Sequence, residues 1–422
     1  MFRAFALSSA AVSALCILAG AACALRRRAR GTEPRAWPGV TCLKPVKGLD
    51  PGARENFEAL LAQDYPGPLE FQFVVEAEGD AALPLLRELA ARDPRVRVVV
   101  AGLARAGSQK LHNLAVAAGE VLPAAAAGAA PGGIVSTAAG GAPASTLPPL
   151  LPLVCSSDSD VRPGPGALRA LVRDLLASGA AAMCAPVYYD GARDLASRAF
   201  QAFANSDLDG ILAVQERIGR ADTLIGGMYV LGAARLAAAG GYASLGPHIS
   251  DDGALGMRLA RLGGRVLQGG EAVRMYLPRA RWREFLSAGH RWWLMMRVAA
   301  PGRFLLAVLL LGPAYGMGLF VLTCAAQPAA AWTPSRDPWA WLAGPGLALL
   351  HVGTTALVGR RCGPPGLRLG YAWLRPLVDA ASVPMWWAAL VWPRIRWRGH
   401  RYVVRANGFA ERLEDPGGAD PP

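Results

Sequence analysis

The sequence predicts an α/β domain with a parallel-rich sheet, flanked by N-terminal and C-terminal transmembrane helices. Residues 36–120 alternate short apolar strands with amphipathic helices, which is the pattern of a parallel sheet of the nucleotide-binding kind. Apolar residues make up 53% of the 422 residues and concentrate toward the two ends of the chain, in uncharged runs long enough to cross a bilayer.

The first apolar run, residues 4–25, is uncharged, and "RRRAR" at 26–30 follows it. A helix rises about 1.5 Å per residue, so this run spans a bilayer core of roughly 30 Å. A cleaved signal peptide is the alternative, but its positive charge would precede the apolar run, and here only Arg3 does. Residues 1–30 are therefore predicted to be a membrane anchor, and the positive-inside rule predicts that the domain after it is cytosolic.

The predicted catalytic domain covers residues 36–282 and is read from its hydrophobic periodicity. Residues 121–152, rich in Ala, Gly and Pro, are predicted to be a low-complexity surface insertion. The predicted elements in chain order are strand 39–48, helix 53–66, strand 69–77, helix 81–94, strand 96–102, strand 151–155, helix 166–178, strand 181–189, a helical stretch 192–222 and a helix that begins after "HISDD" (248–252).

The C-terminal third changes character at residue 283. Residues 283–303 are basic and rich in Trp and Met, which predicts an amphipathic segment at the bilayer interface. Residues 304–393 are predicted to be a transmembrane region with spans at 304–326 and 339–359 and a weaker, re-entrant or interfacial run at 376–393. Residues 394–422 are predicted to be a basic cytosolic tail.

The formal charge of +13 favours a membrane surface over nucleic acid, because the arginines flank the apolar runs. We therefore expect a membrane partner and no nucleic acid. The seven cysteines form no CxxC pair and no His/Cys cluster, so neither a zinc site nor a disulfide framework is predicted.

"DSD" at 158–160 follows the predicted strand 151–155. Carboxylates at positions i and i+2 suit a hard divalent cation, Mg²⁺ or Mn²⁺, held against a diphosphate, so Asp158 and Asp160 are predicted metal ligands. Two solvated turn aspartates are the alternative, since Asp is common in turns.

A second acidic pair, Asp251 and Asp252, precedes a predicted helix. It has two interpretations, helix N-capping or a general base that removes a proton from an acceptor hydroxyl. Arg291 and Trp292 belong either to an interfacial aromatic belt or to a cationic, stacking surface over a diphosphate leaving group.

These pieces, in this order, resemble the ceramide glucosyltransferases, family-21 type glycosyltransferases with bacterial hopanoid-associated relatives. The resemblance runs from about residue 38 to 412, and the matching stretches are "LKPVKG" (43–48), "QDYP" (63–66), "KLHNL" (110–114), "DSDVRP" (158–163), "DD" (251–252), "RW" (291–292) and "WRGHRY" (397–402). It implies a GT-A fold, UDP-glucose as the donor, ceramide as the acceptor, and inversion at the anomeric carbon.

The resemblance also implies roles for residues of this chain. Asp252 would be the catalytic base. Substrate-binding roles would fall on Lys110, Asn113, Asp251, Arg291, Trp292 and Glu76.

The chain departs from the family motif at two positions. The first motif aspartate falls on Ala77, with Glu76, Glu78 or Asp80 as candidate substitutes, and the Q/R position falls on Ala288.

The predicted function is metal-assisted transfer of glucose from UDP-glucose to the primary hydroxyl of ceramide. The alternatives are another sugar, another lipid such as a hopanoid or polyprenyl phosphate, or an inactive membrane homologue, which Ala77 and Ala288 would favour. A transporter is disfavoured, because the spans are few and carry no run of charges.

Overall fold

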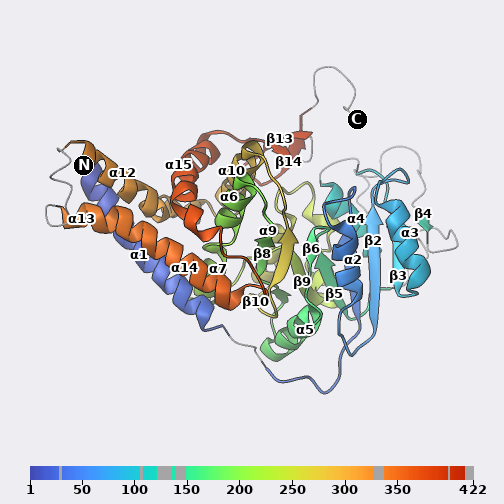
Figure 1. Cartoon of the computed structure of the whole chain (residues 1–422). Helices are drawn as coiled ribbons and strands as arrows, with labels where there is room; N and C mark the ends of the chain where they lie inside the picture. Colours follow the sequence, from blue (N-terminus) through green and yellow to red (C-terminus); the bar gives the residue numbers. More distant parts are fainter. Residues whose placement is uncertain are drawn as a thin grey trace. The chain divides into compact units, whose positions relative to one another are not determined.

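The computed structural model describes residues 1–27, 31–104, 108–120, 135–137, 149–326, 337–397 and 400–413. The chain divides into two units (Figure 1). An α/β unit comprises residues 28–187, 220–276 and 402–422, and a helical unit comprises residues 1–27, 188–219 and 277–401.

The α/β unit is built on an eight-stranded mixed sheet with the order β10-β7-β9-β5-β1-β2-β3-β4. The central strands β1, β2, β3 and β5 are parallel, whereas β9 runs antiparallel to both β5 and β7. The strands are β1 (Val40–Pro45), β2 (Leu69–Val75), β3 (Val96–Val100), β4 (Val135–Thr137), β5 (Leu153–Ser157), β7 (Ala182–Cys184), β9 (Met228–Gly232) and β10 (Val266–Gln268).

The remaining elements of this unit cover the sheet or extend from it. Strand β6 (Val161–Arg162) pairs antiparallel with β11 (Val273–Tyr276), and β13 (His400–Val404) pairs antiparallel with β14 (Ala410–Arg412). The helices are α2 (Ala53–Leu61), α3 (Leu83–Arg92), α4 (Gln109–Ala117), α5 (Ala167–Ser178), α8 (Ala233–Ala238) and α9 (Asp251–Arg261).

The parallel-rich α/β fold predicted from the sequence is confirmed. The burial of its central strands explains why they appear in the sequence as short apolar runs. Every residue of β1 is buried, as expected for a parallel strand covered on both faces. The predicted insertion 121–152 lies mostly outside the described residues. Within it, residues 135–137 form β4, an edge strand antiparallel to β3 that the composition did not predict.

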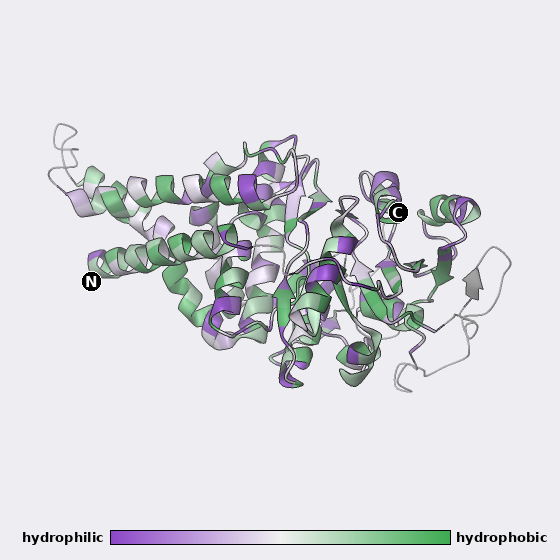
Figure 2. Cartoon of the chain, turned by 90° about the horizontal axis from the view of Figure 1, so that it is seen from below, coloured by the Kyte–Doolittle hydropathy of each residue, from purple (hydrophilic) through white to green (hydrophobic). Residues whose placement is uncertain are grey.

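Among the residues that the structure describes, three helices of the helical unit are long and apolar enough to cross a membrane: Phe2–Leu25, Pro301–Ala325 and Pro338–Cys362. Figure 2 shows the hydrophobic character of the helix that begins at the N terminus. The elements of this unit are α1 (Phe2–Leu25), β8 (Val187–Asp190), α6 (Leu195–Ala204), α7 (Leu208–Arg217), α10 (Trp282–Ala299), α11 (Pro301–Leu306), α12 (Gly312–Ala325), α13 (Pro338–Trp341), α14 (Leu347–Cys362), α15 (Arg375–Val391) and β12 (Arg394–Trp397).

Helix α1 packs closely within this unit and is more than a tether. The hydroxyls of Ser9 and Ser13 donate to the carbonyl of Leu309 at 2.8 and 2.9 Å. The backbones of α1 and α7 meet at Gly20 and Gly210, where a Cβ on Gly210 would lie 2.9 Å from the Gly20 Cα. Small residues at such crossings are typical of packed membrane helices.

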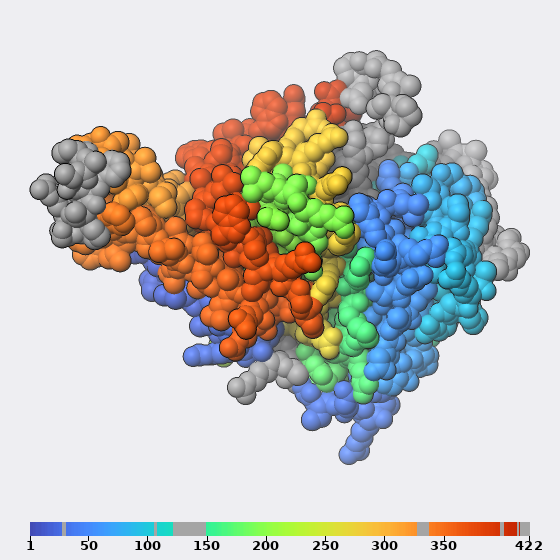
Figure 3. Space-filling model, in the orientation of Figure 1, coloured from blue at the N-terminus to red at the C-terminus, as the bar shows by residue number. Residues whose placement is uncertain are grey.

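Helices α6, α10 and α15 share an apolar core that includes Phe200, Phe285 and Met385. In Figure 3, side chains of α6 (green) lie against those of α10 (yellow) and α15 (orange-red). The run predicted to be re-entrant or interfacial, 376–393, forms most of α15, which has 17 residues and an internal proline, Pro384.

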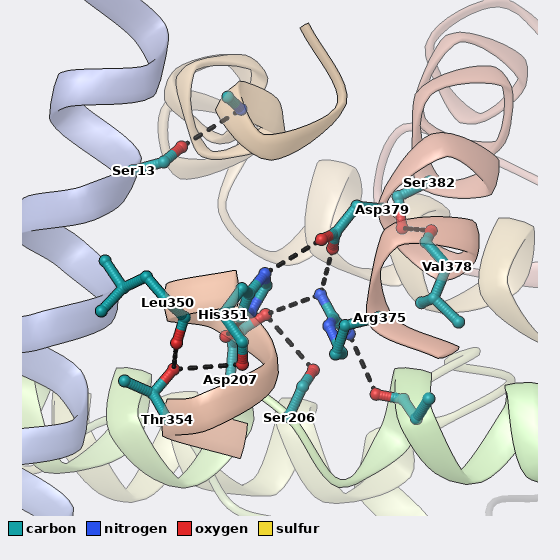
Figure 4. A network of polar contacts seen from close by, with 12 residues as sticks. Ser13, Ser206, Asp207, Leu350, His351, Thr354, Arg375, Val378, Asp379 and Ser382 are labelled. Carbon is teal, nitrogen blue, oxygen red and sulfur yellow. Dashed lines mark hydrogen bonds and ion pairs between the residues drawn. The ribbon is translucent and has the colours of Figure 1, made fainter. Parts of the chain in front are cut away.

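A charged network in the helical unit is buried except at Asp207, whose side chain is 44% exposed (Figure 4). The guanidinium of Arg375 contacts Asp379 and lies 3.5 Å from Asp207 Oδ2. The two ring nitrogens of His351 face Asp379 Oδ2 at 3.0 Å and Asp207 Oδ1 at 2.9 Å. The network therefore joins α14, α15 and the residue before α7, and the Arg375 guanidinium and the His351 imidazole both face the same two carboxylates.

We expect Arg375→Leu to destabilise the helical unit by about 3–5 kcal/mol, because it removes the buried guanidinium that pairs with the carboxylates of Asp207 and Asp379. The midpoint of thermal unfolding in detergent measures this. Arg360→Leu, which removes an exposed arginine of α14, is the control and should change stability by about 0.5 kcal/mol or less. Equal midpoints for the two variants would show that the network contributes nothing measurable.

Candidate active site

Asp158 and Asp160 lie in the loop at the carboxyl end of β5, between β1 and β9 in the sheet. The loop is fixed by its backbone, since Asp158 N–H donates to Gly227 O at 3.0 Å and Val161 N–H donates to Asp158 O at 3.1 Å. The Ser159 hydroxyl donates to Asp50 Oδ2 at 2.7 Å. As predicted from the sequence, the acidic pair directly follows a buried strand.

Lys44, a residue that our sequence analysis did not select, lies buried beneath this loop. Its side-chain nitrogen donates to the carbonyl of Asp158 at 2.6 Å, to Ser157 Oγ at 3.1 Å and to the carbonyl of Val161 at 3.3 Å. Burial lowers the pKa of Lys44 to about 8, even though the carboxylates of Asp160 and Asp158 oppose this shift. The sequence did contain one indication of this role, because Lys44 lies within an otherwise apolar strand.

Lys110, in the first turn of α4, joins the two acidic pairs. Its nitrogen lies 2.7 Å from Asp158 Oδ1 and 2.9 Å from Asp251 Oδ2. Burial opposes the charged form, but the carboxylates of Asp158 and Asp251 outweigh it and hold the pKa of Lys110 well above its usual value. Three residues that are distant in sequence thus meet at one edge of the sheet.

Asp252 is held by hydrogen bonds to both carboxylate oxygens. Its Oδ1 accepts from the Ser250 hydroxyl and from Gly253 N–H, each at 2.8 Å, and its Oδ2 accepts from Gly226 N–H at 2.7 Å. A Cβ at position 226 would lie 2.8 Å from Oδ2, so a larger residue there would displace the Asp252 carboxylate. Burial and the charge of Asp251 raise the pKa of Asp252, against the opposing effects of Lys110 and Ser250.

The capping role at this helix belongs to Ser250. Its hydroxyl accepts from Gly253 N–H at 3.2 Å, and Asp251 and Asp252 form the first turn of α9. A purely capping interpretation of the acidic pair is therefore weakened, since the N-cap position is already filled.

The donor set at the β5 loop suits a hard divalent cation. Asp158 and Asp160 offer carboxylate oxygens, and no cluster of three or more His, Cys, Asp or Glu residues arranged for a metal occurs in the part of the chain that the structure describes. A cation held by only two carboxylates takes its remaining ligands from phosphate oxygens and water, which is how Mg²⁺ is commonly bound beside a diphosphate.

The carboxylates near Ala77 are held by local contacts. Glu76 Oε2 lies 3.3 Å from Lys47 Nζ, and Glu78 forms an exposed ion pair with Arg87. Asp80 accepts from Gly48 N–H at 3.0 Å and so fixes the loop after β1.

Asn113 is buried, and its contacts attach α4 to the sheet. Its Oδ1 accepts from Gln109 Nε2 at 2.7 Å, and its Nδ2 lies 3.4 Å from the carbonyl of Val74. These contacts give Asn113 a structural task, and a role in substrate binding remains a prediction.

Arg291 and Trp292 lie on α10 in the helical unit. The Trp292 ring stacks on Phe203 with a centroid separation of 5.3 Å and an interplanar angle of 15°. It also meets Phe200 edge-on at 5.7 Å. The ring is therefore part of the aromatic packing between α6 and α10.

A family model described as glycosyl transferase family 21 matches residues 5–120 and 151–410 of the chain. A ceramide glucosyltransferase of Candida albicans is 34% identical over 65 residues, which are 15% of this chain and 12% of that enzyme's length. The chain thus spans only a small part of this curated relative.

Two solved structures can be superposed on most of this chain, and the first is similar to it in fold. A mannosyltransferase from Pyrobaculum calidifontis, PcManGT, in complex with GDP-Man and Mn²⁺, superposes with a TM-score of 0.52 at 16% identity and covers 93% of this chain and 99% of that one. S. aureus TarS 1-349 with UDP-GlcNAc has a TM-score of 0.38 at 14% identity, covering 89% and 99%.

We expect the stability of the protein to depend on pH through Lys44. With a folded pKa of about 8 against 10.5 for the free side chain, the unfolded chain binds more protons at Lys44 between these values. The wild type therefore gains stability as pH rises from 8 to 10.5, relative to Lys44→Met.

Thermal unfolding of both proteins across this pH range measures the difference. Lys47→Met, which removes a half-exposed lysine three residues away, should follow the wild-type profile. If the pH profiles of wild type and Lys44→Met run parallel, the buried amine is not the titrating group.

Proposed function

Because the chain belongs to glycosyl transferase family 21, and so is a glycosyltransferase, we propose that it transfers glucose from UDP-glucose to the primary hydroxyl of ceramide, with inversion. The observation that carries this proposal is the Lys110 ammonium between Asp158 and Asp251, which joins the loop of the proposed metal ligands to the acidic pair that contains the candidate base, Asp252. The short match to a ceramide glucosyltransferase supports the choice of sugar and lipid.

Asp158 and Asp160 would hold Mg²⁺ or Mn²⁺ at the donor end of the site. The cation, when bound, would neutralise the charge that develops on the departing diphosphate. Lys44 keeps the Asp158 carbonyl and the loop in place through its buried hydrogen bonds, and Lys110 adds positive charge beside Asp158. Glu76 is proposed to take the nucleotide-binding position of the missing first aspartate.

Asp252 would act at the acceptor end as the general base. Its raised pKa makes it a better proton acceptor than an ordinary aspartate, and the hydrogen bonds from Gly226 and Ser250 fix the direction of its oxygens. Removing the hydroxyl proton as the oxygen attacks the anomeric carbon opposite the leaving diphosphate gives inversion.

The helical unit would anchor the protein in the membrane that contains the lipid. We propose that 1–30 and the spans within 304–393 cross the bilayer, and that 283–303, most of which forms α10, lies at the interface with Arg291 toward the headgroups. The domain 36–282 and the basic tail 394–422 would then lie in the cytosol, at the inner membrane in a bacterium or at the Golgi or ER membrane in a eukaryote.

Membrane preparations incubated with UDP-glucose, UDP-galactose or UDP-GlcNAc plus ceramide test the proposal, with the lipid products identified by mass spectrometry. Glucosylceramide is the expected product. Transfer of a hexose to another lipid class would instead support one of the alternative acceptors. Absence of any transfer would favour an inactive homologue.

We expect transfer to require a divalent cation and Asp158. Asp158→Asn should lower the rate by about 10²-fold or more at unchanged protein abundance, because a neutral amide is a poor ligand for a hard cation. Asp64→Asn, which alters a carboxylate with 70% side-chain exposure, is the matched control. Full activity in excess EDTA would contradict the metal role.

We expect Asp252→Asn to lower turnover by about 10²–10⁴-fold, because the amide cannot accept the proton. In the wild type, the rate should fall with decreasing pH through the raised pKa of Asp252, and thus at a higher pH than for an ordinary aspartate. Asp251→Asn should cause a smaller loss through Lys110. If Asp251→Asn abolishes turnover while Asp252→Asn spares it, the base is Asp251.

A further inference from the structure

The C-terminal hairpin formed by β13 and β14 belongs to the α/β unit, although it follows the last apolar helix in the chain. Its strands pair from Tyr402 with Arg412 to Val404 with Ala410. The turn is closed by Gly408 N–H donating to Arg405 O at 2.9 Å, with Gly408 at φ 84°, where glycine is favoured. This places Phe409 directly after the turn.

The hairpin is attached to the three residues that precede the Ser250 cap. Ile249 N–H donates to Gly408 O at 2.9 Å, and Ala410 N–H donates to Pro247 O at 2.8 Å. Between these two bonds, His248 and Phe409 form an antiparallel bridge, and their rings meet edge-to-face at 6.3 Å. The hairpin thus holds residues 247–249 through an isolated β-bridge at His248 that is flanked by two backbone hydrogen bonds.

Hydrogen bonds continue from this segment to the candidate base. Ser250 N–H donates to His248 Nδ1 at 3.3 Å, and the Ser250 hydroxyl donates to Asp252 Oδ1 at 2.8 Å. Burial lowers the pKa of His248, so that Nδ1 is available as an acceptor. Contacts therefore lead from Phe409 through His248 and Ser250 to the carboxylate.

We propose that the C-terminal hairpin positions Asp252, with Phe409 holding His248 and residues 247–249 so that Ser250 directs the carboxylate. Phe409 is a positioning residue under this proposal, because it acts through His248 and Ser250 and does not meet substrate. The catalytic part of the inference rests on the proposed function. The geometric part, control of the Asp252 environment by the hairpin, does not.

The exposure of Phe409 makes the inference testable. The side chain is 38% exposed, so its removal takes little from the hydrophobic core. Glu411, on the same hairpin, pairs with Arg405 at 2.6 Å in an exposed ion pair. Glu411→Gln is therefore a control that changes the hairpin without touching residues 247–249.

The experiment compares Phe409→Ala, Phe409→Tyr and Glu411→Gln in the full-length protein in detergent. We expect Phe409→Ala to lower kcat about 10-fold with little change in the KM for UDP-glucose, because misplacing a reacting group reduces turnover steeply. Phe409→Tyr keeps the ring and should restore most of the rate. Glu411→Gln should match the wild type.

A second arm combines Phe409→Ala with Ser250→Ala. If both act through the orientation of Asp252, the double variant should lose much less than the product of the two single losses. Multiplicative losses would show independent effects and would overturn the relay, as would a kcat of Phe409→Ala within twofold of wild type.

Hydrogen–deuterium exchange separates this inference from the proposed function. In Phe409→Ala, the peptides containing Gly226 and Gly253, whose N–H groups donate to Asp252, should exchange faster, while peptides of β9 stay as in the wild type. Unchanged exchange at these glycines would refute the positioning role. A wild type that transfers no sugar would instead refute the function, and the exchange result would still decide the positioning.

Discussion

The amine of Lys110 lies between carboxylates that would otherwise repel one another across the edge of the sheet. Asp158 and Asp251 each lie within 3 Å of this amine, and Asp252 is adjacent in sequence to Asp251. Two like charges 4 Å apart near a protein surface repel by about 4 kcal/mol, so the loop after β5 and the start of α9 require an interposed cation. Lys44 acts differently. It donates a hydrogen bond to the backbone carbonyl of Asp158 and so fixes the position of the backbone that carries the Asp158 side chain.

The sequence predicted the parts of this arrangement that depend on local pattern. The apolar runs gave β1, β2, β3 and β5, and the carboxylates after β5 followed from the rule that ligands bind beyond the carboxyl ends of parallel strands. The roles of Lys44 and Ser250 were not predictable in this way. Their hydrogen-bond partners lie on other strands and loops, and no spacing within the chain reveals such a partner. Strand β4 was missed because its flanking composition suggests no strand.

The helical unit shows a second limit of prediction from hydropathy, which identifies apolar helices but not the contacts between their polar side chains. The three apolar helices were expected, and Asp379 lies in the weaker run at 376–393. That its carboxylate meets His351 of α14 and Arg375 of its own helix follows only from the packing. Charges in such surroundings are stable when each has a partner, and this unit brings an arginine, a histidine and two aspartates into one network.

The attachment of residues 400–412 to the segment before α9 has a consequence for biosynthesis. These residues leave the ribosome after every apolar helix of the chain, yet they complete the environment of residues 247–252, which were made some 150 residues earlier. The acidic edge is therefore still unfinished when the last apolar helix has been synthesised. A product that terminates just after α15 would retain the apolar helices and the strands of the sheet, but residues 247–249 would have no hairpin to pair with. The segment that leads into Asp251 and Asp252 thus acquires its last contacts only when residues 400–412 have been made.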